Sequence, residues 1–97
     1  MKYNITTKQG NNYIVSDDSA WLWIRLERDL GYTLTQAQEK MSLGSLEVIT
    51  YILYLAAVGD EHTDYKTHQG WVENEFDTFD VVSDDPKDTP KAVSKDT

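Results

Sequence analysis

Residues 45–59, with the sequence SLEVITYILYLAAVG, decide the fold because a helix made from them is apolar on nearly every side. A single polar strip, formed by Glu47, Thr50 and Tyr54, interrupts the apolar surface. Such a helix has about 14 residues and a length of about 21 Å, which is short of the roughly 30 Å hydrocarbon core of a membrane. We therefore expect the central helix of a small bundle and no membrane span.

Two strands and two helices are predicted before this central helix. Residues 2–15 alternate between apolar and polar around a polar turn, which predicts a β-hairpin. A helix is expected to begin within the polar residues 16–19 and to run to Leu30, where Gly31 ends it. A short helix is expected over residues 35–41, because Thr and Gln have the spacing of a capping box there.

The helix that ends at Leu30 is apolar on two sides. Its broad apolar face includes Trp23, whereas Trp21 and Ile24 fall on the far side near Arg28. A helix of this kind usually packs between two elements, so the simplest interpretation makes both tryptophans core anchors. The alternative is that Trp21 and Ile24, with Arg28, remain partly exposed as a partner-binding surface.

Residues 70–82, GWVENEFDTFDVV, are predicted to form the last helix. Three apolar residues recur in it at i, i+4 and i+7, which is the spacing of one helix face. Acidic residues repeat nearly the same spacing on another face, and they are Glu73, Asp77 and Asp80. Like charges stacked on a helix repel each other, so this acidic stripe is a candidate binding surface for a basic partner.

The predicted fold is α+β and mainly α: a compact bundle of about four helices with a small N-terminal β-hairpin. A chain of 97 residues is long enough for one modest core. We expect one folded domain over residues 1–82, with the hairpin at 2–15 and helices over 16–82. Residues 83–97 contain two prolines and few apolar residues, which predicts a disordered, acidic tail.

The net charge of −8 is concentrated in one part of the chain. Nine acidic residues and one basic residue lie between Asp60 and Asp85, and the rest of the chain is neutral overall. A surface with this charge repels phosphate groups, so nucleic acid is not an expected partner. The charge favours either simple solubility or the attraction of a basic protein.

The sequence offers no arrangement typical of catalysis. It has no cysteine, its glycines are isolated, and its two histidines, His62 and His68, lie in a polar connection without a metal-binding motif. Solvent-exposed loop residues are the simplest interpretation of both histidines. We therefore expect a protein that is not an enzyme and that has no cofactor and no metal.

The order of three segments gives the chain a resemblance to a known family. These segments are AWLWIRLERDLG at 20–31, SLEVITYILYLAA at 45–57 and WVENEFDTFDVV at 71–82, between an N-terminal hairpin and an acidic tail. The chain resembles the small tail assembly chaperones of long-tailed, siphovirus-type bacteriophages. The resemblance implies a protein of the host bacterial cytoplasm that is not part of the mature virion. It implies binding to the tape measure protein, which the chaperone keeps soluble until the tail tube forms around it.

Under this hypothesis the apolar side chains of Trp21 and Ile24 contact the client, while Glu73, Asp77 and Asp80 attract its basic residues. An alternative is a small acidic phage-encoded inhibitor, of the anti-CRISPR or DNA-mimic type, that blocks a basic surface of a host protein. A third is a small interaction module with no phage role. The sequence leaves open whether the protein forms a homo-oligomer.

Overall fold

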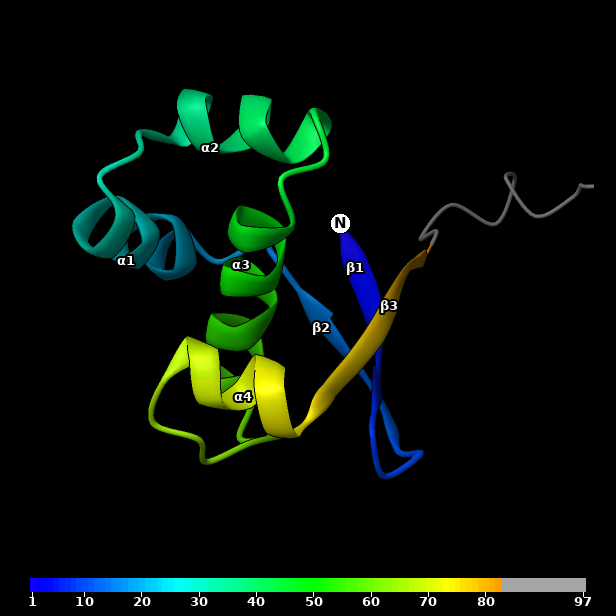
Figure 1. Cartoon of the computed structure of the whole chain (residues 1–97). Helices are drawn as coiled ribbons and strands as arrows, with labels where there is room; N and C mark the ends of the chain where they lie inside the picture. Colours follow the sequence, from blue (N-terminus) through cyan, green and yellow to red (C-terminus); the bar gives the residue numbers. More distant parts are fainter. Residues whose placement is uncertain (83–97) are drawn as a thin grey trace, which may run out of the picture.

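Residues 1–82 are described by a computed structural model, and they form an α+β fold with four helices and three strands, as shown in Figure 1. In chain order these are β1 (Lys2–Thr7), β2 (Asn12–Ser16), α1 (Ala20–Leu30), α2 (Leu34–Ser42), α3 (Leu46–Gly59), α4 (His68–Asn74) and β3 (Phe76–Val82). The predicted α+β class and the four helices are confirmed. The predicted tail, residues 83–97, lies outside the described residues.

Helix α3 is the centre of the helical layer, as its composition predicts. Nine of its residues are buried, and they include Thr50 and Tyr54 from the predicted polar strip. The Tyr54 hydroxyl donates a hydrogen bond to the backbone carbonyl of Tyr65 at 2.8 Å, so the segment before α4 covers this side of α3. Glu47, the third member of the strip, remains exposed near the start of α3.

Helices α1 and α2 begin and end close to where the sequence predicts. Helix α1 ends at Gly31, whose φ of 80° is the left-handed conformation that glycine adopts without steric cost. Helix α2 begins with a capping box, in which the Thr33 side chain accepts from the Gln36 backbone N–H and the Gln36 side chain accepts from the Thr33 backbone N–H.

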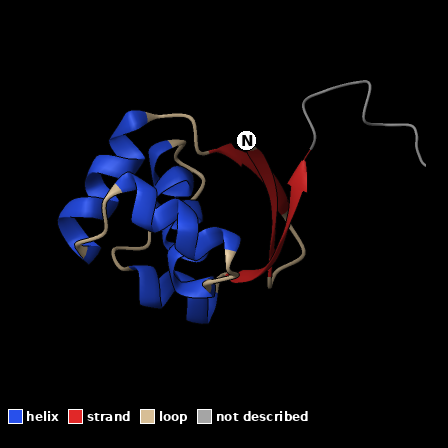
Figure 2. Cartoon of the chain, turned by 90° about the horizontal axis from the view of Figure 1, so that it is seen from above, coloured by secondary structure: helices blue, strands red, loops and turns tan. Residues whose placement is uncertain are grey.

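The N-terminal strands do not form a separate hairpin, which corrects the prediction for residues 2–15. β1 pairs with β2, and it also pairs antiparallel with β3, so β1 is the middle strand of a sheet with the order β2-β1-β3. The helices cover one face of this sheet, as Figure 2 shows. Tyr3, Ile5 and Val15 are buried on that covered face. The third strand provides the support that a two-stranded hairpin lacks in water.

The predicted last helix is also wrong, because only its first part is helical. Helix α4 ends at Asn74, and residues 76–82 form β3 along the free edge of β1. Phe76 lies opposite Thr7 and Phe79 lies opposite Ile5, so a bulge next to Asp77 puts two phenylalanines three residues apart on the same face. Three-residue spacing is also typical of a helix, and this ambiguity explains the error.

The predicted acidic stripe therefore does not exist as a single helix face. Glu73 lies on α4, whereas Asp77 and Asp80 lie on β3. Asp80 lies opposite Asn4, one residue from the inward-facing pair of Phe79 and Ile5, and so it belongs to the sheet face that the helices do not cover. The three acids therefore have the same charge but lie on two different faces of the molecule.

Candidate protein-binding groove

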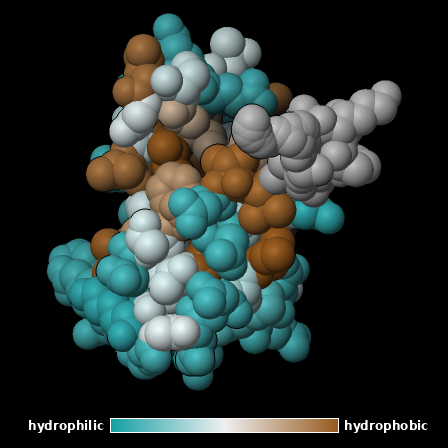
Figure 3. All heavy atoms as spheres, turned by 90° about the vertical axis from the view of Figure 1, so that its right-hand side faces the viewer, coloured by the Kyte–Doolittle hydropathy of each residue, from teal (hydrophilic) through white to brown (hydrophobic). Residues whose placement is uncertain are grey.

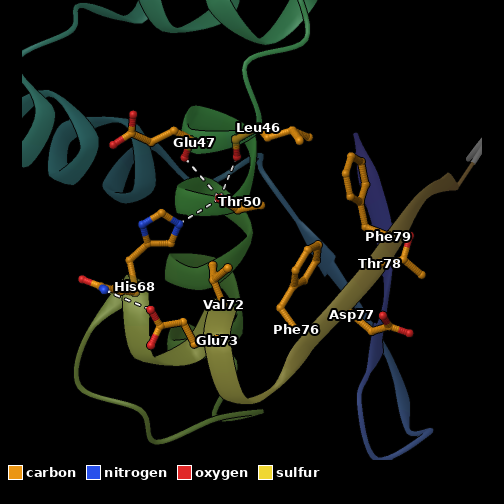
Figure 4. Close-up of a pocket in the computed structure, with 11 residues that line it drawn as sticks. Leu46, Glu47, Thr50, His68, Val72, Glu73, Phe76, Asp77, Thr78 and Phe79 are labelled. Carbon is orange, nitrogen blue, oxygen red and sulfur yellow. Dashed lines mark hydrogen bonds between the residues drawn. The ribbon is translucent and has the colours of Figure 1, made fainter.

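An open apolar groove lies between the N-terminal half of α3, helix α4 and strand β3. Its volume is about 670 Å³, and its apolar lining is provided by Leu46, Val72, Phe76 and Phe79, as Figure 4 shows. Leu46 is 66% exposed although it is a large aliphatic residue, and the other three are partly buried. Apolar surface left open in this way is typical of a site that binds another protein.

Three acidic residues lie along this groove: Glu47 from α3, Glu73 from α4 and Asp77 from the bulge of β3. The Glu73 carboxylate accepts a hydrogen bond from the side-chain amide of Gln69 at 3.0 Å. In the described part of the chain, none of the three has a cationic partner. The groove therefore combines an apolar floor with three carboxylates that form no ion pair within residues 1–82, and the basic side chain of Lys8 donates to the backbone carbonyl of Glu73 at 2.7 Å instead.

Three acidic residues outside the groove do have a cationic partner. The N-terminal amino group of Met1 lies 3.0 Å from the carboxylates of both Asp17 and Asp18, and Arg25 lies 3.0 Å from Asp29. The hydroxyl of Tyr51 also donates to Asp29, and this hydrogen bond is the main cause that lowers the pKa of the Asp29 carboxyl. Within residues 1–82, other exposed acids, such as Glu27 on α1, also form no ion pair, so the three acids of the groove are distinguished by their place beside an apolar surface.

His68 lies inside the groove and was missed as a site residue by sequence reasoning. Its Nε2 atom is 2.8 Å from the hydroxyl oxygen of Thr50, and its ring packs edge-on against Tyr51. Burial is the main cause that lowers the pKa of the His68 imidazole, and the nearby charge of Glu47 opposes this shift. Thr50 and His68 are eighteen positions apart in the sequence, so no local signal would have revealed the contact.

A threonine hydroxyl next to a histidine can in principle act as a nucleophile with its base. Here the hydrogen bonds of Thr50 and His68 instead link α3 to α4. The Thr50 hydroxyl lies 2.6 Å from the backbone carbonyl of Leu46 and donates its only proton there. His68 Nε2–H then donates to the Thr50 oxygen, which assigns the proton of the neutral ring to Nε2. Thr50 is also only 7% exposed.

A second apolar hollow continues from the first on the other side of Phe79. Its volume is about 410 Å³, and its lining comes from β1, α1, α2, α3 and β3. Its apolar and aromatic lining includes Tyr3, Trp23, Met41, Ile49, Phe79 and Val81. Phe79 belongs to both hollows, so the two form one surface along β3. Figure 3 shows that hydrophobic residues gather in the upper and middle part of this face, above a hydrophilic lower part.

The residues predicted on α1 lie in a different place. Trp21 is 44% exposed and Ile24 is 55% exposed, and Arg28 is exposed on the same helix. None of these three residues lines the groove, and Trp21 instead lies beside Ala56 and Gly59 at the end of α3. The predicted partner-binding residues therefore form three separate groups: the three residues of α1, Glu73 and Asp77 on the groove, and Asp80 on the opposite sheet face.

Trp23 shows why the two tryptophans of α1 differ. It packs against the core, and its indole N–H donates to the backbone carbonyl of Asp17 at 2.8 Å. Trp21 has no such position inside the helical layer and remains at the surface. The interpretation of Trp21 as a core anchor is wrong, whereas the interpretation of Trp23 as one is confirmed.

Within residues 1–82, no three His, Cys, Asp or Glu side chains are grouped closely enough to hold a metal ion. In the same range no single helix is long and apolar enough to cross a membrane, and only α2 and α3 taken together, bent by 116° at their junction, have the necessary length and composition. Comparison of the chain with known protein families, with curated proteins and with solved structures finds no match.

Proposed function

We propose that the protein is a tail assembly chaperone of a long-tailed bacteriophage, which binds the tape measure protein and keeps it soluble during tail assembly. The observation that carries the proposal is the open apolar groove of α3, α4 and β3 with its three carboxylates, which form no ion pair within residues 1–82. A holding protein needs apolar surface that is accessible to a client before the client is buried elsewhere. The order of segments that resembles this family supports the same conclusion.

In this role the protein binds and does not catalyse. The groove offers apolar contacts from Leu46, Val72, Phe76 and Phe79 and charge from its acidic residues, while its histidine hydrogen-bonds to a threonine whose proton is already donated. The protein would act in the cytoplasm of the infected bacterium and be absent from the mature virion. Mass spectrometry of purified virions tests this last point, and its detection there in stoichiometric amounts would contradict it.

Co-expression with the tape measure gene of the same phage tests the function directly. The soluble fraction of the tape measure protein is compared with and without this chain, at equal expression levels. We expect the chain to raise the soluble fraction several-fold and to co-purify with the tape measure protein. An unchanged soluble fraction, with no co-purification, would overturn the proposed function.

The acidic inhibitor is the second candidate function, and the charge between Asp60 and Asp85 favours it. The described acids of this region are divided among a loop, the groove and the far sheet face, as shown by Asp64, Asp77 and Asp80. A mimic of nucleic acid needs a single charged surface facing its target, so this division favours the chaperone. Binding to a host nuclease that weakens steeply as salt is raised would favour the inhibitor instead.

A further inference from the structure

We propose that the groove binds one amphipathic helix of about three turns, lying along β3, with lysine or arginine residues at the end next to α4. The inference rests on the proposed function only in naming this surface as the client site. It commits to a helix with a specified distribution of charge, and it assigns the orientation of that helix.

Within residues 1–82, the helical layer leaves part of the inner face of β3 open. Helix α3 packs against β2, whereas the helix that contacts β3 is α4, which comes immediately before it in the chain. Figure 1 shows α1, α2 and α3 on the side of the sheet away from β3. Phe79 and Val81 face this gap, and Val81 is 58% exposed. A helix placed beside α3 would complete the layer in the way that two-layer folds bury a sheet face.

The length of the groove sets the length of its ligand. Along β3 the lining runs from Phe76 in the first hollow to Val81 in the second. Five residue steps in a strand cover about 17 Å. A helix of about 11 residues, or three turns, has the same length. Such a helix presents apolar residues at i, i+4 and i+7 on one face, which suits the two hollows on either side of Phe79.

The charges set its orientation because they lie at one end. Glu47, Glu73 and Asp77 all line the first hollow, next to α4, and have no cationic partner within residues 1–82. Among residues 1–82, the lining of the second hollow has one carboxylate, that of Asp17, which pairs at 3.0 Å with the amino group of Met1. A ligand with basic residues at one end is therefore attracted in one orientation and not in the reverse.

Peptide binding to the full-length protein tests the proposal. The probe is a fluorescent 14-residue helical peptide with leucine at i, i+4 and i+7 and three lysines at one end. One control peptide has glutamate in place of lysine, and another has a central proline that breaks the helix. The protein variants are Glu73→Lys/Asp77→Lys, which reverses two charges in the groove, and Asp80→Lys, which reverses one charge on the far sheet face.

We expect the wild type to bind the lysine peptide and to bind the proline peptide at least tenfold more weakly. Glu73→Lys/Asp77→Lys should weaken binding of the lysine peptide about tenfold at low salt and strengthen binding of the glutamate peptide. Asp80→Lys should change the affinity for the lysine peptide, and that for the glutamate peptide, by less than twofold. A spin label on the lysine end should broaden the amide signals of α4 and not those around Met41. Circular dichroism establishes that both variants remain folded.

Several results would overturn the inference. They are no binding of the lysine peptide, equal effects of Asp80→Lys and of the groove variant, equal binding of the proline peptide, or broadening around Met41. Equal binding of the proline peptide would indicate an extended ligand paired with β3. A wild-type dimer that Glu73→Lys/Asp77→Lys converts to a monomer would indicate that a second copy occupies the groove. If these results occur while the wild type still keeps the tape measure protein soluble, the inference fails and the proposed function stands.

Discussion

Asp77 and Asp80 are three residues apart in β3, yet Asp77 lines the groove and Asp80 lies opposite Asn4 on the other face of the sheet. The bulge next to Asp77 brings Phe76 and Phe79 to the same inward face on either side of it. The two aspartates therefore have the same charge and nearly the same sequence position in different surroundings. This makes Asp80 a natural control for every charge variant of the groove.

His68 predicts a loss of stability under mildly acidic conditions. Burial lowers the pKa of its imidazole, so the unfolded chain binds a proton more readily than the folded one. The free energy of unfolding should be highest above the ordinary histidine pKa of about 6.5 and should fall as the pH drops through that value toward the lowered one. Urea denaturation between pH 5 and pH 7.5 measures this. His68→Gln should flatten the dependence and His62→Gln should retain it, whereas equal slopes for wild type and His68→Gln would contradict the account.

The pKa of the Asp29 carboxyl is expected to depend on the hydroxyl of Tyr51. The hydrogen bond from the Tyr51 hydroxyl is the main cause of the lowered pKa of Asp29, and Arg25 contributes as well. Tyr51→Phe should raise the pKa of Asp29 toward the ordinary value, as followed by NMR titration of its side-chain carbons. Tyr54→Phe is the matched control, because the Tyr54 hydroxyl donates to the Tyr65 carbonyl instead. An unchanged Asp29 pKa in Tyr51→Phe would show that the contact between α1 and α3 is not the one described.

Thr33 and Thr35 test the start of α2. Thr33 is the capping residue, whereas Thr35 lies within the helix and is exposed. Thr33→Ala should lower the free energy of unfolding by about 1 kcal/mol, because the Gln36 backbone N–H loses its acceptor. Thr35→Ala should be neutral or slightly stabilising. Chemical denaturation measures both, and equal effects of the two substitutions would argue against the capping box.

Gly31 and Gly59 predict opposite effects of the same substitution. Gly31 has a φ of 80°, so Gly31→Ala should destabilise the fold by about 1 kcal/mol. Gly59 is the last residue of α3, and a side-chain carbon there would meet Trp21 at an ordinary distance of 3.5 Å. Gly59→Ala should therefore be neutral or stabilise by up to about 1 kcal/mol. The midpoint temperature of thermal unfolding should fall for Gly31→Ala and should stay the same or rise for Gly59→Ala. A similar decrease in both variants would contradict this prediction.

Local patterns predicted α1, α2 and α3 well because their signals lie within a few residues of each helix. The Thr33 and Gln36 pair and Gly31 mark helix ends, and the apolar run of α3 requires burial wherever it packs. The position of Trp21 and Ile24 on the far side of α1 was also readable, and both side chains are exposed. Whether they bind a partner stays a prediction.

The sheet and the groove were not predictable from local patterns. β3 depends on pairing with β1, whose residues lie 69 to 80 positions earlier in the sequence, and its bulge gives Phe76 and Phe79 the spacing of a helix. The groove depends on that strand, because β3 carries Asp77 and Phe79 to a site facing α3 and α4. Contacts between such distant segments leave no trace in the spacing of neighbouring residues. Glu73 and Asp77 were thus predicted as candidates, but not the surface to which they belong.

The central claim is that the groove, and not the exposed side of α1, holds the client. The most direct measurement is the soluble fraction of the tape measure protein co-expressed with wild type, Glu73→Lys/Asp77→Lys, Asp80→Lys, or Trp21→Ser/Ile24→Ser, at equal levels of each folded variant. The account predicts that Glu73→Lys/Asp77→Lys loses most of the solubilising effect while the other two variants retain it. Loss with Trp21→Ser/Ile24→Ser, together with full activity of the groove variant, would contradict it.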